Sequence, residues 1–391
     1  MNSETQSSAN VYSRLLLPVI VSAGSVGLSI GLIVPLTSIV LEQRGVSVVA
    51  IGMNATIYSL AVLLVGPFFP KIVQRVGMLR AMVAGALLSG VFVFGLWLEE
   101  SLWYWYLLRF CLGVTGGIHW VSSEAWINAM APEHSRGRIV GAYATIWSMG
   151  IAAGPVLLKF IGVEGAIPFV ISGLIMGGAS IPLLLVPGDE RANLPSRPNQ
   201  VVQMASVAPL AAMAGFISGF LETAVLALLP VYGLRSGIAT SGALILVSVF
   251  AVGSFAWQPV VGWVVDKVSF KRVALVVAAV SVIAVPLVHF TLKVPIIAGV
   301  LLFVWGGSVG AYYTLGMINI GQVFKGGDLT AASAMFVMAY TFGMVVGPLL
   351  GSTSMHFIGP AGFLVVVGMV PLIFFPLAFK HTGFCNVDVK N

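Results

Sequence analysis

Charged residues are scarce in this chain. They make up 8% of 391 residues, whereas hydrophobic residues make up 59%. An ordinary soluble domain has about 25% charged and roughly 45 to 50% apolar residues, so a water-soluble fold is excluded. Each membrane span needs about 20 mostly apolar residues, which leaves room for about twelve spans. We therefore expect an all-α integral membrane protein, with the lipid bilayer as a partner.

Cysteine is also scarce, because the chain contains only Cys111, inside an apolar run, and Cys385, near the C-terminus. Two cysteines cannot build a disulfide framework, and no metal-ligand spacing is visible. The sequence also lacks a Gly-x-x-x-x-Gly-Lys-[Ser/Thr] stretch, which excludes a nucleotide-driven pump of that type. The basic residues, which give a net charge of +6, form no continuous cluster. We expect no enzyme, no cofactor, no metal and no nucleic-acid partner.

The apolar runs, divided by Gly, Pro and charged residues, predict twelve helices. The first six lie near 15–41, 47–69, 79–98, 102–130, 137–160 and 165–187, and the second six near 206–232, 240–265, 271–291, 295–323, 328–352 and 360–379. This gives an N-terminal tail (1–14), a six-helix bundle (15–187), a central loop (188–204), a second six-helix bundle (205–380) and a C-terminal tail (381–391). We expect a monomer.

The distribution of Lys and Arg predicts the orientation. With both termini in the cytoplasm, fourteen of the 19 basic residues fall on the inner side and four on the outer side. The outer four are Arg44, Lys159, Arg235 and Lys293, and only Arg109 lies inside a span. This asymmetry is the one that the positive-inside rule describes. A multi-pass protein of a bacterial cytoplasmic (inner) membrane, with both termini cytoplasmic, is therefore expected.

Several features recur at a nearly constant distance along the chain. The repeated pairs are Gln74-Arg75 with Asp266-Lys267 (offset 192), Arg80 with Arg272 (192), Gly150-x-x-x-Gly154-Pro155 with Gly343-x-x-x-Gly347-Pro348 (193), and Pro35 with Pro230 (195). Two parallel repeats of six helices are typical of transporters in which a midplane site opens alternately to either side. We expect the glycine-proline elements to serve helix bending or packing.

The loop between the eighth and ninth spans carries a specific short motif, which we call the second loop motif. It reads Gly262-x-x-x-Asp266-Lys267-x-Ser269-x-Lys271-Arg272 and resembles the loop motif of the major facilitator superfamily. The first loop motif, Pro70 to Arg80, has Pro70 in place of the opening Gly and Gln74 in place of the acid. The resemblance implies a gating role for Asp266, Lys267, Lys271 and Arg272, with Gln74, Arg75 and Arg80 as a degenerate counterpart. Retention of the basic residues for topology alone is the alternative.

The fourth span adds to this resemblance. Arg109-x-x-x-Gly113-x-x-Gly116-Gly117 is similar to the arginine motif in the fourth helix of the same superfamily. The Gly-Pro element of the fifth span resembles one found in its antiporters. Trp120-x-x-x-Glu124-x-Trp126, followed by Arg136-Gly137-Arg138, resembles a branch of bacterial permeases of the YcaD type. The superfamily resemblance covers nearly the whole chain and implies the corresponding twelve-helix fold.

A polar stripe follows one face of the fourth span. At about 100° per residue, Gly113, Gly116, Trp120 and Glu124 lie within about 60° of Arg109, and we expect this stripe to line a central cavity. Pairing of Glu124 with Arg136 or Arg138 is an equal alternative to substrate contact. His119 lies off the stripe, where a structural role is favoured over titration during transport. In the tenth span, Tyr312, Tyr313 and Asn319 are candidates for the substrate wall.

Glu222 is the sharpest candidate. It lies in an otherwise apolar stretch of the seventh span, where an acid costs roughly 2.5 to 3.5 kcal/mol. Arg109 is predicted at a similar depth, so we expect Glu222 to couple protons to transport, with Arg109 as its partner. A static ion pair is the alternative.

Taken with the resemblance, these residues predict a proton-coupled secondary transporter of a small organic solute, with export by antiport favoured. Uptake by symport is the close alternative. A receptor or lipid-handling protein on the same fold is the alternative from another class.

Overall fold

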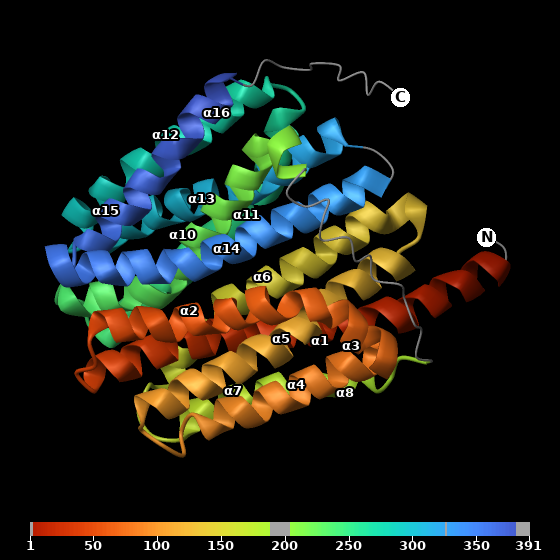
Figure 1. The fold of residues 1–391 in the computed structure, drawn as a ribbon, viewed down its shortest axis with the longest axis horizontal. Coiled ribbons are helices and arrows are strands. Elements are labelled where there is room, and N and C mark those ends of the chain that lie inside the picture. The colour runs from red at the N-terminus through yellow and green to blue at the C-terminus, as the bar shows by residue number, and fades with distance from the viewer. Residues whose placement is uncertain (1–2, 188–203, 325–326, 381–391) are drawn as a thin grey trace. The chain divides into compact units, whose positions relative to one another are not determined.

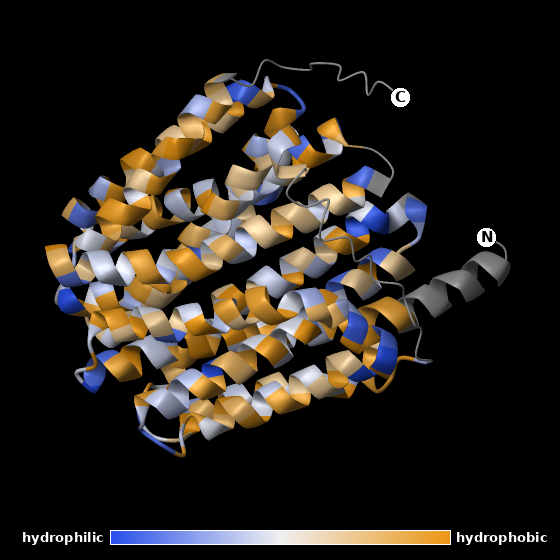
Figure 2. Cartoon of the chain, viewed as in Figure 1, coloured by the Kyte–Doolittle hydropathy of each residue, from blue (hydrophilic) through white to orange (hydrophobic). Residues whose placement is uncertain are grey.

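The computed structural model describes residues 3–187, 204–324 and 327–380. Almost all of them are helical, and none of these described residues lies in a strand. The predicted C-terminal tail (381–391), and the predicted central loop except Met204, lie outside the described residues. Figure 1 shows long, roughly parallel helices within each half of the chain. In Figure 2 hydrophobic residues cover most of each helix and hydrophilic residues gather near many helix ends.

The helices of the first half begin with a long α1. They are α1 (Ser3–Gln43), α2 (Val48–Val65), η1 (Gly66–Phe68), α3 (Phe69–Val76), α4 (Met78–Gly95), α5 (Leu102–Met130), η2 (Glu133–Ser135), α6 (Arg136–Ile161), α7 (Ile167–Gly178) and α8 (Ser180–Leu183). Helix α1 thus starts twelve residues before its predicted start at residue 15. The first loop motif also lies largely on a helix, because α3 continues to Val76 and ends at Gly77, which has a φ of 96°.

The second half has the same sequence of long helices and a broken last one. It contains α10 (Pro209–Arg235), α11 (Thr240–Val265), α12 (Phe270–Thr291), α13 (Pro295–Val323), α14 (Gly327–Ile358), α15 (Gly362–Met369), η3 (Val370–Ile373) and α16 (Phe374–Lys380). The bounds of the long helices agree with the predicted spans to within a few residues at most ends.

Ten helical segments of the described chain are long and apolar enough to cross a membrane, by length and composition. Two further helices occupy the places of the predicted fourth and sixth spans. One is α5, which has 29 residues but carries Arg109, His119 and Glu124. The other is the shorter apolar segment Ile167–Leu183. The predicted pattern of twelve is therefore present, although α5 is too polar and Ile167–Leu183 is too short to count among the ten.

The described residues divide into two compact units. Unit 1 lies within Met1–Ser196 and Val225–Ala251, and unit 2 lies within Arg197–Ala224 and Val252–Asn391. These limits pass through α10 and α11. The predicted bundle limits, 15–187 and 205–380, stay a prediction.

Glycines allow α1 and α6 to approach closely in unit 1. A Cβ atom at Gly150 would meet the backbone of Gly24 and Leu28, and one at Gly154 would overlap the backbone of Gly31. Small residues of this kind let membrane helices pack backbone to backbone. Pro155 lies inside α6, which continues to Ile161. The packing role of this element is thus visible, whereas helix bending stays a prediction.

Unit 2 contains the corresponding contact between α10 and α14. A Cβ atom at Gly343 would meet the backbone of Phe216 and Phe220, and one at Gly347 would overlap the backbone of Phe220. Pro348 lies inside α14. Since Gly150 faces Gly24 and Gly343 faces Phe216, the packing register relates α1 to α10 by an offset of 192. Pro35 and Pro230, which are 195 apart, are therefore three residues out of this register.

A buried pair of hydroxyl groups also repeats. Ser89 and Thr115 join α4 to α5 with an oxygen–oxygen distance of 2.7 Å. Ser281 and Ser308 join α12 to α13 at the same distance. Their offsets are 192 and 193, so the internal repeat extends to individual side-chain contacts.

Candidate functional site

Three partly buried residues of unit 2 form a polar and aromatic group, which we call the Glu222 cluster: Glu222 on α10, Tyr340 on α14 and Tyr313 on α13. The Tyr340 hydroxyl donates a hydrogen bond to Oε2 of Glu222 over 2.9 Å. The rings of Tyr313 and Tyr340 meet edge to face, with centroids 6.0 Å apart. The structure thus brings the predicted Glu222 and Tyr313 together through a third residue.

The glycine at position 219 explains why Tyr340 reaches Glu222. Residues three apart share a helix face, so Gly219 and Glu222 lie on the same side of α10. A Cβ atom at Gly219 would overlap the carbonyl oxygen of Tyr340. Because Gly219 has no side chain, α14 can approach α10 at this point. The Tyr340 side chain then lies beside the carboxyl group one turn further along.

Aromatic rings accompany the carboxyl group in this cluster. Tyr313 contacts the ring of Phe336 at a centroid distance of 5.0 Å, in addition to its contact with Tyr340. A carboxylate is expensive in such a place unless it is paired or protonated. The group can therefore take up and release a proton, or accept a hydrogen bond from a solute.

Tyr340 was missed by the sequence reasoning. Its signal was weak, because a tyrosine within a span is usually attributed to an interfacial belt. The repeat offers one clue, since Tyr340 follows Trp147 by 193 residues. That offset shows the position to be equivalent, but it cannot reveal the carboxyl partner on another helix.

Arg109 has partners within unit 1. Its Nε donates to the backbone carbonyl of Asn54 over 3.2 Å, and its guanidinium carbon lies 5.3 Å from the centre of the Tyr58 ring. The side chain is 2% exposed. Glu222 belongs to unit 2 and is bonded to Tyr340, so the pairing of Arg109 with Glu222 stays a prediction.

The polar stripe of α5 divides into two parts. Gly113 and Gly116 lie against Tyr58 of α2, so together with Arg109 they pack against a neighbouring helix. This corrects the expectation that the whole stripe lines a cavity, because the glycine positions are used for helix contact. Trp120 and Glu124 are partly exposed, and a substrate contact there stays a prediction.

Glu124 does not pair with Arg136 or Arg138, which was the alternative to a substrate contact. No hydrogen bond or ion pair joins the Glu124 carboxylate to Arg136, Arg138 or any other residue in the described ranges. Both arginines are exposed. In those same ranges no three His, Cys, Asp or Glu residues group closely enough to hold a metal ion.

His119 occupies a buried position between α5 and α1. It is 0% exposed, and its Nε2 lies 3.0 Å from the Ser22 hydroxyl. This bond ties the two helices together and gives His119 a structural contact. A role in proton movement stays a prediction.

The two adjacent tyrosines of α13 have different neighbours. Tyr313 joins the Glu222 cluster, whereas Tyr312 is fully buried and packs edge to face on Phe374 of α16 at 5.0 Å. Asn319, also on α13, is 2% exposed. Tyr312 is therefore a core residue in this structure, and Tyr313 is the stronger of the three candidates for contact with a solute.

The second loop motif lies at the end of α11 and the start of α12. Lys267 stacks over the Trp263 ring at 3.8 Å, and Nζ of Lys271 donates to the Phe379 carbonyl over 2.7 Å. The exposed Asp266 side chain forms no hydrogen bond or ion pair with the residues described here. The predicted gate is thus not closed through Asp266 in this state, and its gating role stays a prediction.

The first loop motif places its polar side chains on the surface. Gln74, Arg75 and Arg80 are all exposed, the first two on the last turn of α3 and Arg80 at the start of α4. Within the described residues, no contact that distinguishes a gating role from a topological one is present at Gln74 or Arg75. Their role as a degenerate counterpart of the second loop motif stays a prediction.

Comparison with known proteins agrees with this arrangement. The model of the Major Facilitator Superfamily matches residues 19–317 and 211–383. The uncharacterised MFS-type transporter YfkF of Bacillus subtilis is 28% identical over 339 residues, which cover 84% of this chain and 86% of YfkF. The MFS-type transporter YcaD of Salmonella typhi is 23% identical over 379 residues, covering 96% and 97%.

Two solved structures share the fold. A bacterial homologue of the human lysosomal transporter Spinster, in an inward-facing and unoccupied conformation, has a TM-score of 0.71 at 13% identity and covers 94% of this chain and 95% of its own. A mutant form of the nucleoside transporter NupG has a TM-score of 0.72 at 13% identity and covers 95% and 100%.

Proposed function

The chain belongs to the Major Facilitator Superfamily of membrane transporters, and from this premise we propose that it couples proton movement to the transport of a small organic solute at Glu222. The observation that carries the proposal is the hydrogen bond from Tyr340 to Glu222 over 2.9 Å. It holds a partly buried, ionisable carboxyl group beside a tyrosine on an otherwise apolar helix, where acids are rare and usually functional.

The proposed chemistry follows from the two protonation states of this carboxyl group. The protonated acid is neutral and fits the apolar surroundings, whereas the carboxylate needs donors or a cation. A conformational change that alters access to water or to a cation would shift the balance between these states. Proton uptake and release would then alternate with the solute-binding states.

The proposed direction is export by antiport. The glycine-proline element of α6 resembles one found in antiporters, and Gly150 and Gly154 provide a close contact with α1. The Glu222 cluster offers one carboxyl group and aromatic faces rather than the many polar groups that a sugar site needs. This composition favours a solute with an apolar body and few hydrogen-bonding groups.

The experiment begins with identification of the solute. An untargeted comparison of metabolites inside and outside wild-type and deletion cells supplies candidates. The purified full-length protein is then placed in proteoliposomes, and flux of each candidate is measured with and without an imposed pH gradient. Solute exchange at equal pH on both sides is measured in parallel.

Glu222→Gln should abolish the stimulation by the pH gradient and leave solute exchange measurable. Glutamine keeps the size of the side chain and an acceptor for Tyr340 but cannot ionise. Glu164→Gln, at an exposed acid, is the matched control and should behave as wild type. Undiminished gradient-driven transport by folded Glu222→Gln protein would remove Glu222 from the mechanism.

We also propose a monomer in the cytoplasmic membrane with both termini in the cytoplasm, as the distribution of basic residues predicts. After replacement of Cys111 and Cys385, single cysteines at Gln74 and Ser269 should react with an impermeant thiol reagent only from the cytoplasmic side. Cysteines at Glu99 and Glu164 should react only from outside. Labelling of both pairs from the same side would refute this orientation.

A further inference from the structure

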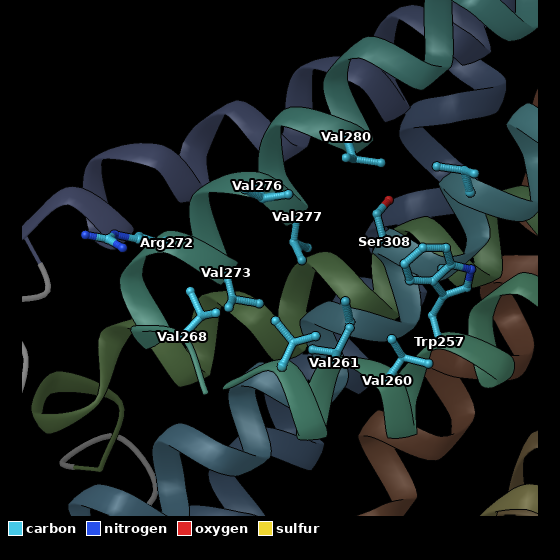
Figure 3. A pocket seen from close by; sticks show the side chains of 14 residues that line it. Trp257, Val260, Val261, Val268, Arg272, Val273, Val276, Val277, Val280 and Ser308 are labelled. Carbon is cyan, nitrogen blue, oxygen red and sulfur yellow. The ribbon is translucent and has the colours of Figure 1, made fainter. Parts of the chain in front are cut away.

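A groove in unit 2 has an almost wholly apolar lining. It lies between α11, α12 and α13, has a volume of about 240 Å³ and is lined chiefly by valines, among them Val260, Val261, Val273 and Val277. Arg272 lies at one end, and Trp257 and Ser308 lie toward the other (Figure 3). From Arg272 to Val280, α12 spans about 12 Å at ~1.5 Å per residue.

A comparison with unit 1 explains why space is left here. At the offset of 192, Val261 corresponds to Phe69 (261 − 69 = 192). Phe69 is 1% exposed. A Cβ atom at Gly117 of α5 would meet the Phe69 ring and the Val62 side chain of α2, so the ring lies against Gly117 and near Val62. The large ring thus fills the inter-helical space in unit 1. Valine at position 261 fills much less of the corresponding space.

The groove offers few hydrogen bonds to a polar solute. Ser308 is the main neutral polar residue of the lining, and its hydroxyl already bonds to Ser281 at 2.7 Å and to the Trp305 carbonyl at 2.7 Å. The rest of the lining is apolar apart from Arg272 and the indole of Trp257. An apolar chain is therefore a better match for the interior than a hydrophilic molecule.

Two basic side chains lie at or near the end of the groove where Arg272 stands, and they favour a ligand with an anionic group. Arg272 is exposed and its side chain forms no hydrogen bond or ion pair with the described part of the chain. Lys267 adds a second exposed cation on the loop that precedes α12. Guanidinium groups bind phosphate through several N–H donors. Val276, one of the lining valines, is 60% exposed, so the groove is open to the apolar surface of the helices.

We propose that this groove binds one anionic phospholipid, with part of an acyl chain between α11, α12 and α13 and the phosphate on Arg272. By the predicted orientation, the lipid belongs to the cytoplasmic leaflet. The site is separate from the Glu222 cluster and does not depend on the identity of the transported solute.

Native mass spectrometry of the full-length protein in a non-ionic detergent tests the proposal. The protein is titrated with palmitoyl-oleoyl phosphatidylglycerol and with the phosphatidylcholine that has the same chains. One phosphatidylglycerol should bind, about fivefold more tightly than phosphatidylcholine. This is the gain in affinity for anionic lipid that one nearby basic residue contributes. Arg272→Gln should remove that preference. Arg80→Gln, the repeat-related control with the same change of charge, should keep it.

A second variant tests the proposed position of the acyl chain. Val261→Phe places in unit 2 the side chain that fills the related space in unit 1, and it should weaken binding of both lipids by a similar factor. Val300→Phe, at an exposed position of α13 that does not line the groove, is the control. Equal effects of Arg272→Gln and Arg80→Gln would overturn the proposal, as would unchanged binding by folded Val261→Phe protein.

Location is read out independently by photolabelling of the wild-type protein. Phosphatidylglycerol with a diazirine in one acyl chain should label peptides that contain Val260 to Val264 and Val273 to Val280. Labelling spread evenly over exposed apolar positions such as Val91 and Phe290 would refute a specific site. This measurement decides the matter even where Val261→Phe fails to fold.

Discussion

The contact between α1 and α6 in unit 1 and that between α10 and α14 in unit 2 occupy equivalent positions in the internal repeat. In unit 1 Gly150 lies beside Gly24 and Gly154 beside Gly31, and Gly27 lies against the backbone of Trp147. In unit 2 Gly343 lies against the backbone of Phe216, and Gly219 lies against the backbone of Tyr340, which is the contact equivalent to that of Gly27 with Trp147. The same close approach thus serves packing alone in unit 1, whereas in unit 2 it brings a tyrosine to an acid.

The residues equivalent to the Glu222 cluster sharpen the contrast. At offsets of 192 and 193, Glu222 corresponds to Ile30 and Tyr340 to Trp147. Both unit 1 residues pack against buried hydrophobic side chains. Duplication therefore preserved the helix arrangement, while the ionisable chemistry of this contact is present in only one of the two copies.

The largest expected effect is disruption of the glycine contact in unit 1. Gly154→Leu would drive a side chain into the backbone of Gly31, and overpacking of this kind costs about 3 kcal/mol. We expect a marked fall in the thermal midpoint of the detergent-solubilised protein, measured by loss of its monomer peak in size-exclusion chromatography. Gly141→Leu, on the same helix with open space around it, should change the midpoint little. Equal midpoints for the two variants would contradict the packing role.

The next effect contrasts Phe69 with Val261. Phe69→Val removes a fully buried ring and should destabilise unit 1 by about 2 kcal/mol. Val261→Phe enters an existing groove and should leave the thermal midpoint nearly unchanged or raise it slightly. Both midpoints are measured in the same detergent after removal of lipid. Destabilisation by Val261→Phe equal to that by Phe69→Val would show that the two sites are equally filled.

A smaller effect is expected from loss of the hydroxyl group that binds Glu222. Tyr340→Phe keeps the ring but removes a hydrogen bond worth about 1.4 kcal/mol, which corresponds to about tenfold in transport rate if the bond is needed in the rate-limiting state. Solute flux in proteoliposomes measures it. Tyr312→Phe, whose ring packs on Phe374 instead, is the control. A tenfold loss in Tyr312→Phe with normal flux in Tyr340→Phe would reverse the assignment.

The smallest effect concerns an ion pair at the helix ends of unit 1. The Arg235 guanidinium forms two hydrogen bonds to the Glu42 carboxylate, over 2.7 and 2.9 Å. Both side chains are partly exposed, so Glu42→Gln should cost only about 0.5 kcal/mol, and less at high salt. Glu100→Gln, which alters the looser 3.5 Å pair with Arg44, should have no measurable effect. A large loss on Glu42→Gln would indicate that this pair controls a conformational state.

Much of the fold followed from the distribution of apolar residues. Membrane helices satisfy their backbone hydrogen bonds internally, so apolar length and short polar breaks are enough to locate them. The difficult cases were α3, where the predicted loop is helical, and α5, whose polar stripe lowers its hydropathy. A helix end depends on local capping and on neighbouring contacts, and hydropathy contains neither.

The site was only partly predictable. Glu222 stood out because an acid in an apolar run is expensive wherever it lies. Its partner Tyr340 is 118 residues away, and no local pattern connects the two. Arg109 shows a similar limit, because its acceptor is the backbone carbonyl of Asn54, and every residue type presents such an atom.

The sequence by itself determined that this protein is a helical membrane protein with an internal repeat, because composition and spacing are properties of the chain alone, and its loop motif pointed to a transporter. Tertiary structure decided which side chains meet: Tyr340 with Glu222, Tyr312 with Phe374, and the valines around the groove in unit 2. These contacts depend on the distance between helices and on which face each helix presents. Small residues such as Gly219 set that distance, and their effect becomes visible only when two helices pack together.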